Sequence, residues 1–191
     1  GWNLWGQTNA LAGSSNLHSV PITAVSSVFQ SIQDTILILQ SGPKRLSSSA
    51  GHQLMDGHPY RHSRIDQANA HTDRLLEALA KGDWDTFGTI AESEALSLHA
   101  LMVSSYDGYT LLTEGSWEAI ERVRRYRRES GVPVYFTFDA GPNMHLLFPR
   151  DCQSVVSEFV HTQLLPLCEN SIFIEDEIGT GPQKLNIKDY L

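Results

Sequence analysis

VPVYFTF, at residues 132–138, is an apolar run that is followed by the polar segment DAGPN at 139–143 and by a second apolar run, MHLLF, at 144–148. Both runs are short, and the first is rich in aromatic and β-branched residues, which is typical of buried strands. Asp139, Gly141 and Asn143 are residue types that favour a tight turn. The stretch therefore predicts two neighbouring strands that are joined by a turn.

Further strands are predicted on either side of this pair. The run DTILILQ at 34–40 is β-rich and ends at the turn signal Ser41-Gly42-Pro43. The run SIFI at 171–174 has the same character. Residues 1–16 are rich in Gly, Asn and Ser, and they predict a loop with a short strand.

Helical periodicity fills the remaining segments. Apolar residues recur at helical intervals from Pro59 to Lys81, where Gly82 can form a left-handed cap, and Asp83 can cap a second helix to Leu101. Further helices are predicted over 117–130, with Trp117 on the apolar face, and over 154–167. The element order predicts an α+β fold, in which helices cover one face of an antiparallel sheet.

Composition excludes several classes of protein. The net charge of −8, from 14 Lys and Arg against 22 Asp and Glu, disfavours binding to nucleic acid or to an anionic membrane. The apolar stretches are too short to span a bilayer, and the first residues of the chain do not have the pattern that we expect of a signal peptide. The two cysteines, Cys152 and Cys168, are expected to be buried free thiols in a cytoplasmic protein. The start at Gly1, without Met, suggests a piece of a longer protein.

Two groups of side chains, four histidines and five arginines, are expected to have a structural role rather than to bind a ligand. Four histidines lie close together in sequence, namely His52, His58, His62 and His71. His58 and His62 would share a helix face only if the helix began before Pro59, so we expect hydrogen-bonding histidines rather than a metal site. The five arginines of residues 122–128 are expected to form a solvated helix face, partly paired with Glu118, Glu121 and Glu129.

Two other segments have the composition of a binding or catalytic site. LSSSAG, at 46–51, can present hydroxyls and backbone N–H groups to an anion, although a flexible linker would have the same composition. Asp139 follows a buried strand and lies near Gly141, which leaves room for a substrate to approach a general base. A simple hairpin turn would also explain these residues. No serine hydrolase elbow, Walker loop or dinucleotide fingerprint is present.

At these two segments the sequence resembles the mevalonate diphosphate decarboxylases, which belong to the superfamily of galactokinase, homoserine kinase and mevalonate kinase. YFTFDAGPN, at 135–143, is similar to the family's strand and loop, and Lys44 with SSSAG at 47–51 is similar to its Ser-rich segment. Phe87, Glu92-Ser93 and His99-Ala100 resemble a family helix, and GTGP at 179–182 resembles the family's tail. The resemblance covers nearly the whole chain.

The resemblance implies a fold, a reaction and a site. Residues 1–191 would be the C-terminal, substrate-side domain of an enzyme that uses ATP and Mg²⁺ to phosphorylate and decarboxylate mevalonate 5-diphosphate, which gives isopentenyl diphosphate. Asp139 would be the catalytic residue that orients or deprotonates the 3-hydroxyl. The substrate would be bound by residues of the two segments, namely Ser47, Ser48, Ser49, Gly51, Gly141 and Asn143. The family also suggests a homodimer.

The chain lacks some of the family's functional residues and differs from the family pattern at others. The family's ATP loop, its substrate-binding Lys and Tyr and its catalytic Arg are not in this chain, so we expect the chain alone to be inactive. His52 stands where the family usually has Met, Ser49 stands where members often have a cation, and residues 55–59 depart from the family pattern. Two alternatives stay open, a related kinase that does not decarboxylate and a non-catalytic protein that binds a phosphometabolite or a partner.

Overall fold

The computed structural model of the chain describes residues 1–42, 55–106, 108–179 and 181. Its centre is a four-stranded antiparallel sheet with the order β4-β5-β3-β6. The strands are β3 (Ile32–Leu37), β4 (Tyr135–Phe138), β5 (Met144–Pro149) and β6 (Phe173–Glu177). The predicted α+β fold, with helices covering an antiparallel sheet, is confirmed. Within the described ranges, no helix is long and apolar enough to cross a membrane.

The predicted helices and their ends agree with the structure over most of the chain. They are α2 (Arg61–Lys81), α3 (Trp84–Ser104), α4 (Glu114–Ser130) and α5 (Gln153–Phe159). Gly82 ends α2 with a φ of 76°, a left-handed conformation that glycine adopts without steric cost. The Asp83 side chain then accepts a hydrogen bond from the Thr86 N–H and begins α3.

Three local predictions need correction. The N-terminal residues form a β-hairpin of β1 (Asn3–Gly6) and β2 (Ser15–Pro21), which polar contacts such as Gln7 N–H to Asn16 Oδ1 support. The helix predicted over 154–167 is regular only in α5; a π turn (Val160–Leu164) and a 3₁₀ turn (Leu165–Leu167) follow, because Pro166 has no N–H for a regular helix. Trp117 is exposed rather than part of the apolar face of α4.

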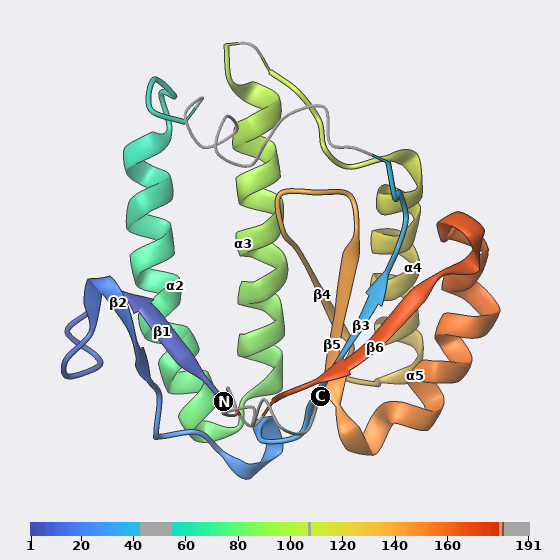
Figure 1. The fold of residues 1–191 in the computed structure, drawn as a ribbon, viewed down its shortest axis with the longest axis horizontal. Coiled ribbons are helices and arrows are strands. Elements are labelled where there is room, and N and C mark those ends of the chain that lie inside the picture. Colours follow the sequence, from blue (N-terminus) through green and yellow to red (C-terminus); the bar gives the residue numbers. More distant parts are fainter. Residues whose placement is uncertain (43–54, 107, 180, 182–191) are drawn as a thin grey trace, which may run out of the picture.

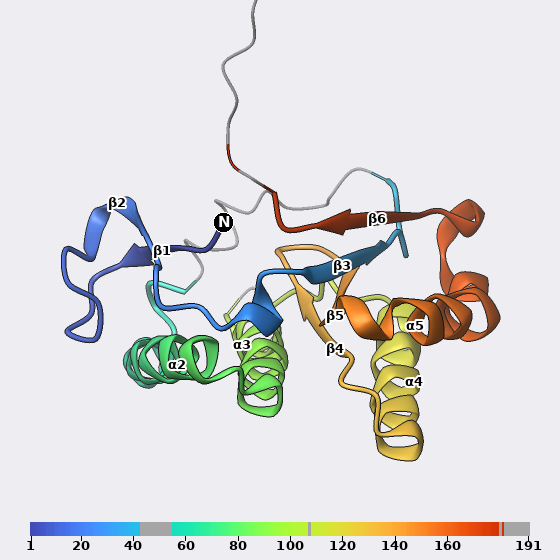
Figure 2. The ribbon, with the colours of Figure 1, turned by 90° about the horizontal axis from the view of Figure 1, so that it is seen from below.

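The two faces of the sheet have different environments. One face packs against α4 and α5, and its core contains Leu37, Phe136, Leu146 and Phe159 (Figure 2). The opposite face carries the alternate residues of each strand, and we call it the open face. Ile36 and Ile174 lie on it as cross-strand partners, and Ile174 is about half exposed, at 49%.

Helices α2 and α3 form an antiparallel hairpin beside the β4 edge of the sheet (Figure 1). Their inner faces join a second apolar cluster, in which Trp2, Phe29, Trp84 and Phe87 make edge-to-face and tilted ring contacts. The sheet and the helical hairpin therefore have connected but distinct apolar cores.

A buried ion pair joins α3, α4 and β4. Glu92 of α3 is 5% exposed and accepts two hydrogen bonds from the Arg127 guanidinium, at 2.6 and 3.2 Å. Arg127 also donates to the Val134 carbonyl oxygen at 2.7 Å, and its guanidinium lies 4.3 Å from the Tyr135 ring centroid. Arg122 pairs with Glu118 as predicted, but Arg127 does not belong to a solvated face.

Helix α3 approaches β4 very closely at Gly88. A Cβ atom on Gly88 would lie 2.0 Å from the Tyr135 ring, which leaves no space for a side chain. The Tyr135 hydroxyl donates to Asp85 at 2.5 Å, and burial raises the pKa of that hydroxyl, so it stays protonated as a donor. Tyr135 is thus held against α3 at both its ring and its hydroxyl.

We predict that Gly88→Ala lowers the free energy of unfolding by about 1–3 kcal/mol, because the added methyl group forces α3 away from Tyr135. The measurement is urea unfolding of the chain, monitored by circular dichroism. Gly115→Ala in α4 is the matched control, since its Cβ would meet its nearest atoms at 3.6 and 3.7 Å. The control should leave the stability unchanged or raise it by up to about 1 kcal/mol. Equal stabilities of wild type and Gly88→Ala would contradict the close approach.

Candidate functional site

The turn at residues 139–143 connects β4 to β5 and holds three of the predicted site residues. Asp139 is exposed at the end of β4, whereas Gly141 and Pro142 are buried and Asn143 is half-buried. Inside the turn, the Gly141 N–H donates to the Asp139 carbonyl oxygen at 2.8 Å. The structure therefore places a carboxylate at the surface of a turn whose other residues are packed against the protein.

His99 of α3 supports the first residue of this turn. It is 4% exposed, and its Nε2 lies 3.0 Å from the Asp139 carbonyl oxygen. Burial lowers the pKa of His99, and the bond to the Asp139 carbonyl partly opposes this shift. A carbonyl oxygen can only accept, so Nε2 carries a proton, and burial favours the neutral form of the ring. His99 thus fixes the backbone from which the Asp139 carboxylate projects.

Ser116 of α4 supports the other side of the turn. It is fully buried, and its hydroxyl donates to the Pro142 carbonyl oxygen at 2.9 Å. Ser116 also belongs to a capping box with Thr113 at the start of α4, so its position is set by the helix end itself. The turn is consequently held by two helices at two separate carbonyl groups.

Asn143 connects the turn to the end of β3. Its Oδ1 accepts hydrogen bonds from the backbone N–H groups of Leu39, at 3.0 Å, and of Gln40, at 3.1 Å. Residues 39 and 40 lie shortly before the Ser-rich segment in the sequence. The substrate-binding role of Asn143 remains a prediction. The side-chain oxygen of Asn143 has a structural role, because it accepts both of these hydrogen bonds.

The remaining predicted site residues, Ser47, Ser48, Ser49 and Gly51, lie outside the described residues. Their proximity to Asp139 therefore stays a prediction that rests on the resemblance. The Ser-rich segment begins at Leu46, seven residues after Leu39 in the sequence, and the Leu39 N–H is bonded to the Asn143 side chain.

A charged pair lies on the open face of the sheet, near the turn. The His145 Nδ1 of β5 is 2.8 Å from the Asp34 Oδ2 of β3, and both side chains are partly exposed, at 29% and 27%. His145 is the cross-strand partner of Thr137, which lies two residues before Asp139. The hydrogen bond that His145 donates to Asp34 is the largest cause that raises the pKa of His145, and burial opposes it. This pair was not among the predicted site residues.

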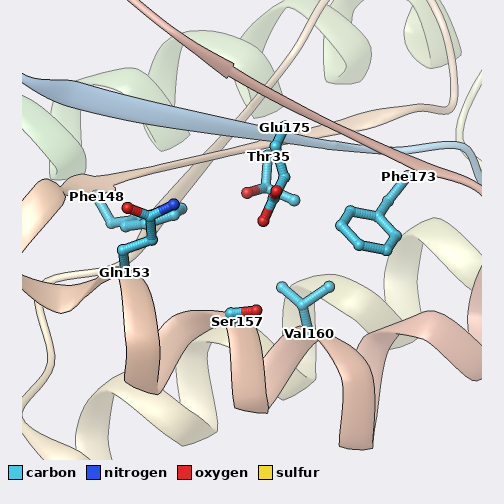
Figure 3. Close-up of a pocket in the computed structure, with 7 residues that line it drawn as sticks. All are labelled: Thr35, Phe148, Gln153, Ser157, Val160, Phe173 and Glu175. Carbon is cyan, nitrogen blue, oxygen red and sulfur yellow. The ribbon is translucent and has the colours of Figure 1, made fainter.

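Among the hollows that the described residues form, two adjoin the central sheet. A hollow of about 310 Å³ opens on the open face, with mainly apolar walls that include Trp2, Ile32 and Leu147, and Asp34 also lines it. A narrow crevice lies between α5 and the covered face of β3 and β6, and Figure 3 shows Thr35 and Glu175 directed toward Ser157 across it. The crevice has no space for a water-sized molecule. Of the two, the hollow on the open face is the one that adjoins the charged pair.

Of the four clustered histidines, His58 and His71 have specific partners, and His52 lies outside the described residues. The His58 Nδ1 accepts the Tyr60 N–H, its Nε2 contacts the Ser104 hydroxyl, and the His71 Nδ1 contacts Glu94 at 2.6 Å. Within the described ranges, no three His, Cys, Asp or Glu side chains converge as metal ligands. The described side chains therefore do not form a complete Mg²⁺ site.

The sequence predicted a catalytic role for Asp139, which stays a prediction, but it did not predict the side chains that hold its turn. The Thr113-x-x-Ser116 spacing is a capping signal, but the long-range bond from Ser116 to Pro142 cannot be read from it. The strand alternation could have placed His145 and Asp34 on one face, because their strands are adjacent and antiparallel. The alternation of side chains along these two strands could thus have indicated that His145 and Asp34 lie close together.

Comparison with known proteins assigns a family to the chain. Residues 35–185 match the family model described as the mevalonate 5-diphosphate decarboxylase C-terminal domain. The phosphomevalonate decarboxylase of Haloferax volcanii is 30% identical over 94 residues, which cover 49% of this chain and 29% of that protein. The diphosphomevalonate decarboxylase of Candida albicans is 24% identical over 169 residues, which cover 81% of this chain and 46% of that protein.

A solved structure shows the same fold. It is a structure of the mevalonate diphosphate decarboxylase from Enterococcus faecalis, and it concerns the ATP binding mechanism mediated by mevalonate diphosphate. The TM-score between the two structures is 0.67 and the sequence identity is 20%, and the matched region covers 82% of this chain and 44% of that one. The chain spans less than half the length of each of these relatives. Since the family model matches well over half of its residues, the chain belongs to the mevalonate 5-diphosphate decarboxylase C-terminal domain family.

Proposed function

We propose that the complete protein containing this chain is an ATP-dependent mevalonate 5-diphosphate decarboxylase, and that Asp139 is its catalytic residue. The observation that supports this most is the Asp139 turn. It combines an exposed carboxylate with backbone carbonyl groups bonded to His99 and Ser116, and with the Asn143 side chain, which accepts a hydrogen bond from the Leu39 N–H. Such support holds a carboxylate in one place, as general base catalysis requires. Family membership supplies the reaction class.

In the proposed reaction, the substrate's 3-hydroxyl first receives the γ-phosphoryl group of ATP. Asp139 would accept the hydroxyl proton or a hydrogen bond from that hydroxyl during transfer. The C3–O bond then breaks with loss of phosphate, and the C1–C2 bond breaks with loss of CO₂. The electrons of the C1–C2 bond form the C2=C3 double bond of isopentenyl diphosphate, which balances the reaction.

Other parts of the proposal concern the whole protein. ATP and Mg²⁺ would be held mainly by residues outside this chain, so the chain alone would be inactive. The structure concerned with ATP binding by the Enterococcus faecalis enzyme supports ATP as a co-substrate. We place the protein in the cytoplasm, where ATP is available, and we propose a homodimer on the basis of the family resemblance.

A second candidate has its own observation. The Haloferax volcanii relative is named for phosphomevalonate rather than for the diphosphate, and it is 30% identical to this chain. Ser49 would also leave the Ser-rich segment without a cation of its own at that position. Mevalonate 5-phosphate carries less negative charge, so it would depend less on such a cation. The same enzyme class would then act on the monophosphate.

The test supplies the complete protein with ATP and Mg²⁺ and with either mevalonate 5-diphosphate or mevalonate 5-phosphate, and follows ADP and CO₂ together. Equal release of ADP and CO₂ would establish a decarboxylase, and the preferred substrate would decide between the two candidates. ADP without CO₂ would identify a kinase that does not decarboxylate. If neither product forms, the proposal is wrong and a non-catalytic binding protein is favoured.

We predict that Asp139→Asn lowers kcat of the complete protein by about 10²–10⁴-fold, because the amide cannot accept the hydroxyl proton. Steady-state assays and urea unfolding of each variant are the measurements, and the fold should be unchanged. Asp151→Asn, at another exposed aspartate on the far end of β5, is the matched control with unchanged kcat. Wild-type turnover in Asp139→Asn would remove Asp139 from the mechanism.

We predict that Ser48→Ala raises KM for the phosphorylated substrate about tenfold and changes kcat much less, because one hydrogen bond to a charged phosphate is lost. Initial rates over a range of substrate concentrations separate the two constants. Ser154→Ala, at an exposed serine of α5, serves as the control. An unchanged KM would mean that the Ser-rich segment is a linker.

A further inference from the structure

We propose that His145 is a substrate-binding residue, which donates through Nε2 to an anionic group of the substrate beside Asp139. The inference rests on the proposed function, since it concerns the same site. It assigns a role to the charged pair of His145 and Asp34, which the predicted site residues did not include.

The orientation of the His145 ring is fixed by its neighbours. The Nδ1 atom is bonded to Asp34 Oδ2 at 2.8 Å, so the Nε2 atom is directed away from Asp34 on the opposite side of the ring. Within the described ranges, Nε2 has no hydrogen-bond partner, and the side chain is 29% exposed. His145 therefore presents a donor to the open face while its other nitrogen anchors it.

The charges around His145 favour its protonated form. Asp34 on β3 and Asp176 on β6 are directly opposite each other in register, which is unfavourable for two carboxylates. Asp34, Asp139 and Asp176 all raise the pKa of His145. The Asp34 Oδ1 atom is buried and has no hydrogen-bond partner among the described residues, and the other oxygen, Oδ2, is bonded to His145, so protonation of His145 would compensate the charge of this carboxylate.

The position of His145 relative to Asp139 provides the link to the substrate. His145 lies opposite Thr137 in the β4–β5 pair, and Asp139 follows two residues after Thr137. The electrostatic effect of Asp139 on His145 agrees with this short separation. A hydroxy acid whose hydroxyl reaches Asp139 would therefore bring its carboxylate or its phosphate close to the His145 imidazolium.

The first test compares KM in the complete protein at several pH values. Wild-type KM should rise as the pH increases through the raised pKa of His145, because the neutral ring binds an anion less well. His145→Gln should raise KM about tenfold at low pH and remove this dependence. His145→Lys should restore most of the binding, and Asp34→Asn should shift the rise in KM to lower pH, because His145 loses the partner that raises its pKa. His71→Gln, which breaks another His–carboxylate pair, is the matched control.

A purely structural pair would give a different result. The stability contributed by His145 would be complete below about pH 6.5 and lost as the pH rises through its raised folded-state pKa. His145→Gln would then change the pH dependence of unfolding but not that of KM. The proposal would be overturned if the His145→Gln variant had the same KM values, and the same dependence of KM on pH, as the wild type.

The second test does not depend on turnover and identifies the anionic group. The pKa of His145 is measured by NMR in the complete protein, with His145→Gln assigning the signal, and the probes are mevalonate 5-diphosphate, mevalonate and inorganic pyrophosphate. Anion binding should raise the pKa further; a rise with mevalonate would indicate the carboxylate, and a rise with pyrophosphate the phosphate. No rise with any probe would overturn the proposal, whereas a rise in a protein without turnover would refute the proposed function alone.

Discussion

The buried ion pair between Glu92 and Arg127 is the contact on which the arrangement of the helices and the sheet depends. A carboxylate that is 5% exposed is strongly unfavourable without a hydrogen-bonded cation, so α3 and α4 are held where Arg127 can reach it. Arg127 also bonds the Val134 carbonyl, which leads directly into β4. The start of β4 is thus fixed relative to both helices before the strand reaches the Asp139 turn.

The support of the Asp139 turn follows from this arrangement. His99 lies two helical turns beyond Glu92 on α3, and Ser116 begins the same helix that carries Arg127. Both side chains bond carbonyl groups of the turn and so hold its backbone. The Tyr135 ring, packed against Gly88, limits how closely α3 can approach β4, and the hydrogen bond from Tyr135 to Asp85 keeps α3 from moving away. The position of the carboxylate is therefore a consequence of helix packing.

Much of the fold could be predicted from the sequence because the signals are local. The ends of α2 and α4 depend on Gly82 and Gly131, and β4 and β5 depend on short apolar runs. The partner of Arg127 could not be predicted, because Glu92 is 35 residues away and local spacing favoured nearer glutamates. The β1–β2 hairpin was missed since polar contacts such as that of Asn16 support it. For the site, a strand-end motif indicated Asp139, whereas its supports are long-range contacts.

The two edges of the sheet differ in a way that bears on self-association. The β4 edge is covered by α3, while β6 forms the other edge and is largely exposed. Glu175, Asp176 and Glu177 occupy consecutive positions of β6, so a second copy that paired there would bring two acidic strands together. Like charges of this kind oppose edge-to-edge strand pairing. The strand thus protects the chain against sheet extension, and any homodimer would have to form through a different surface.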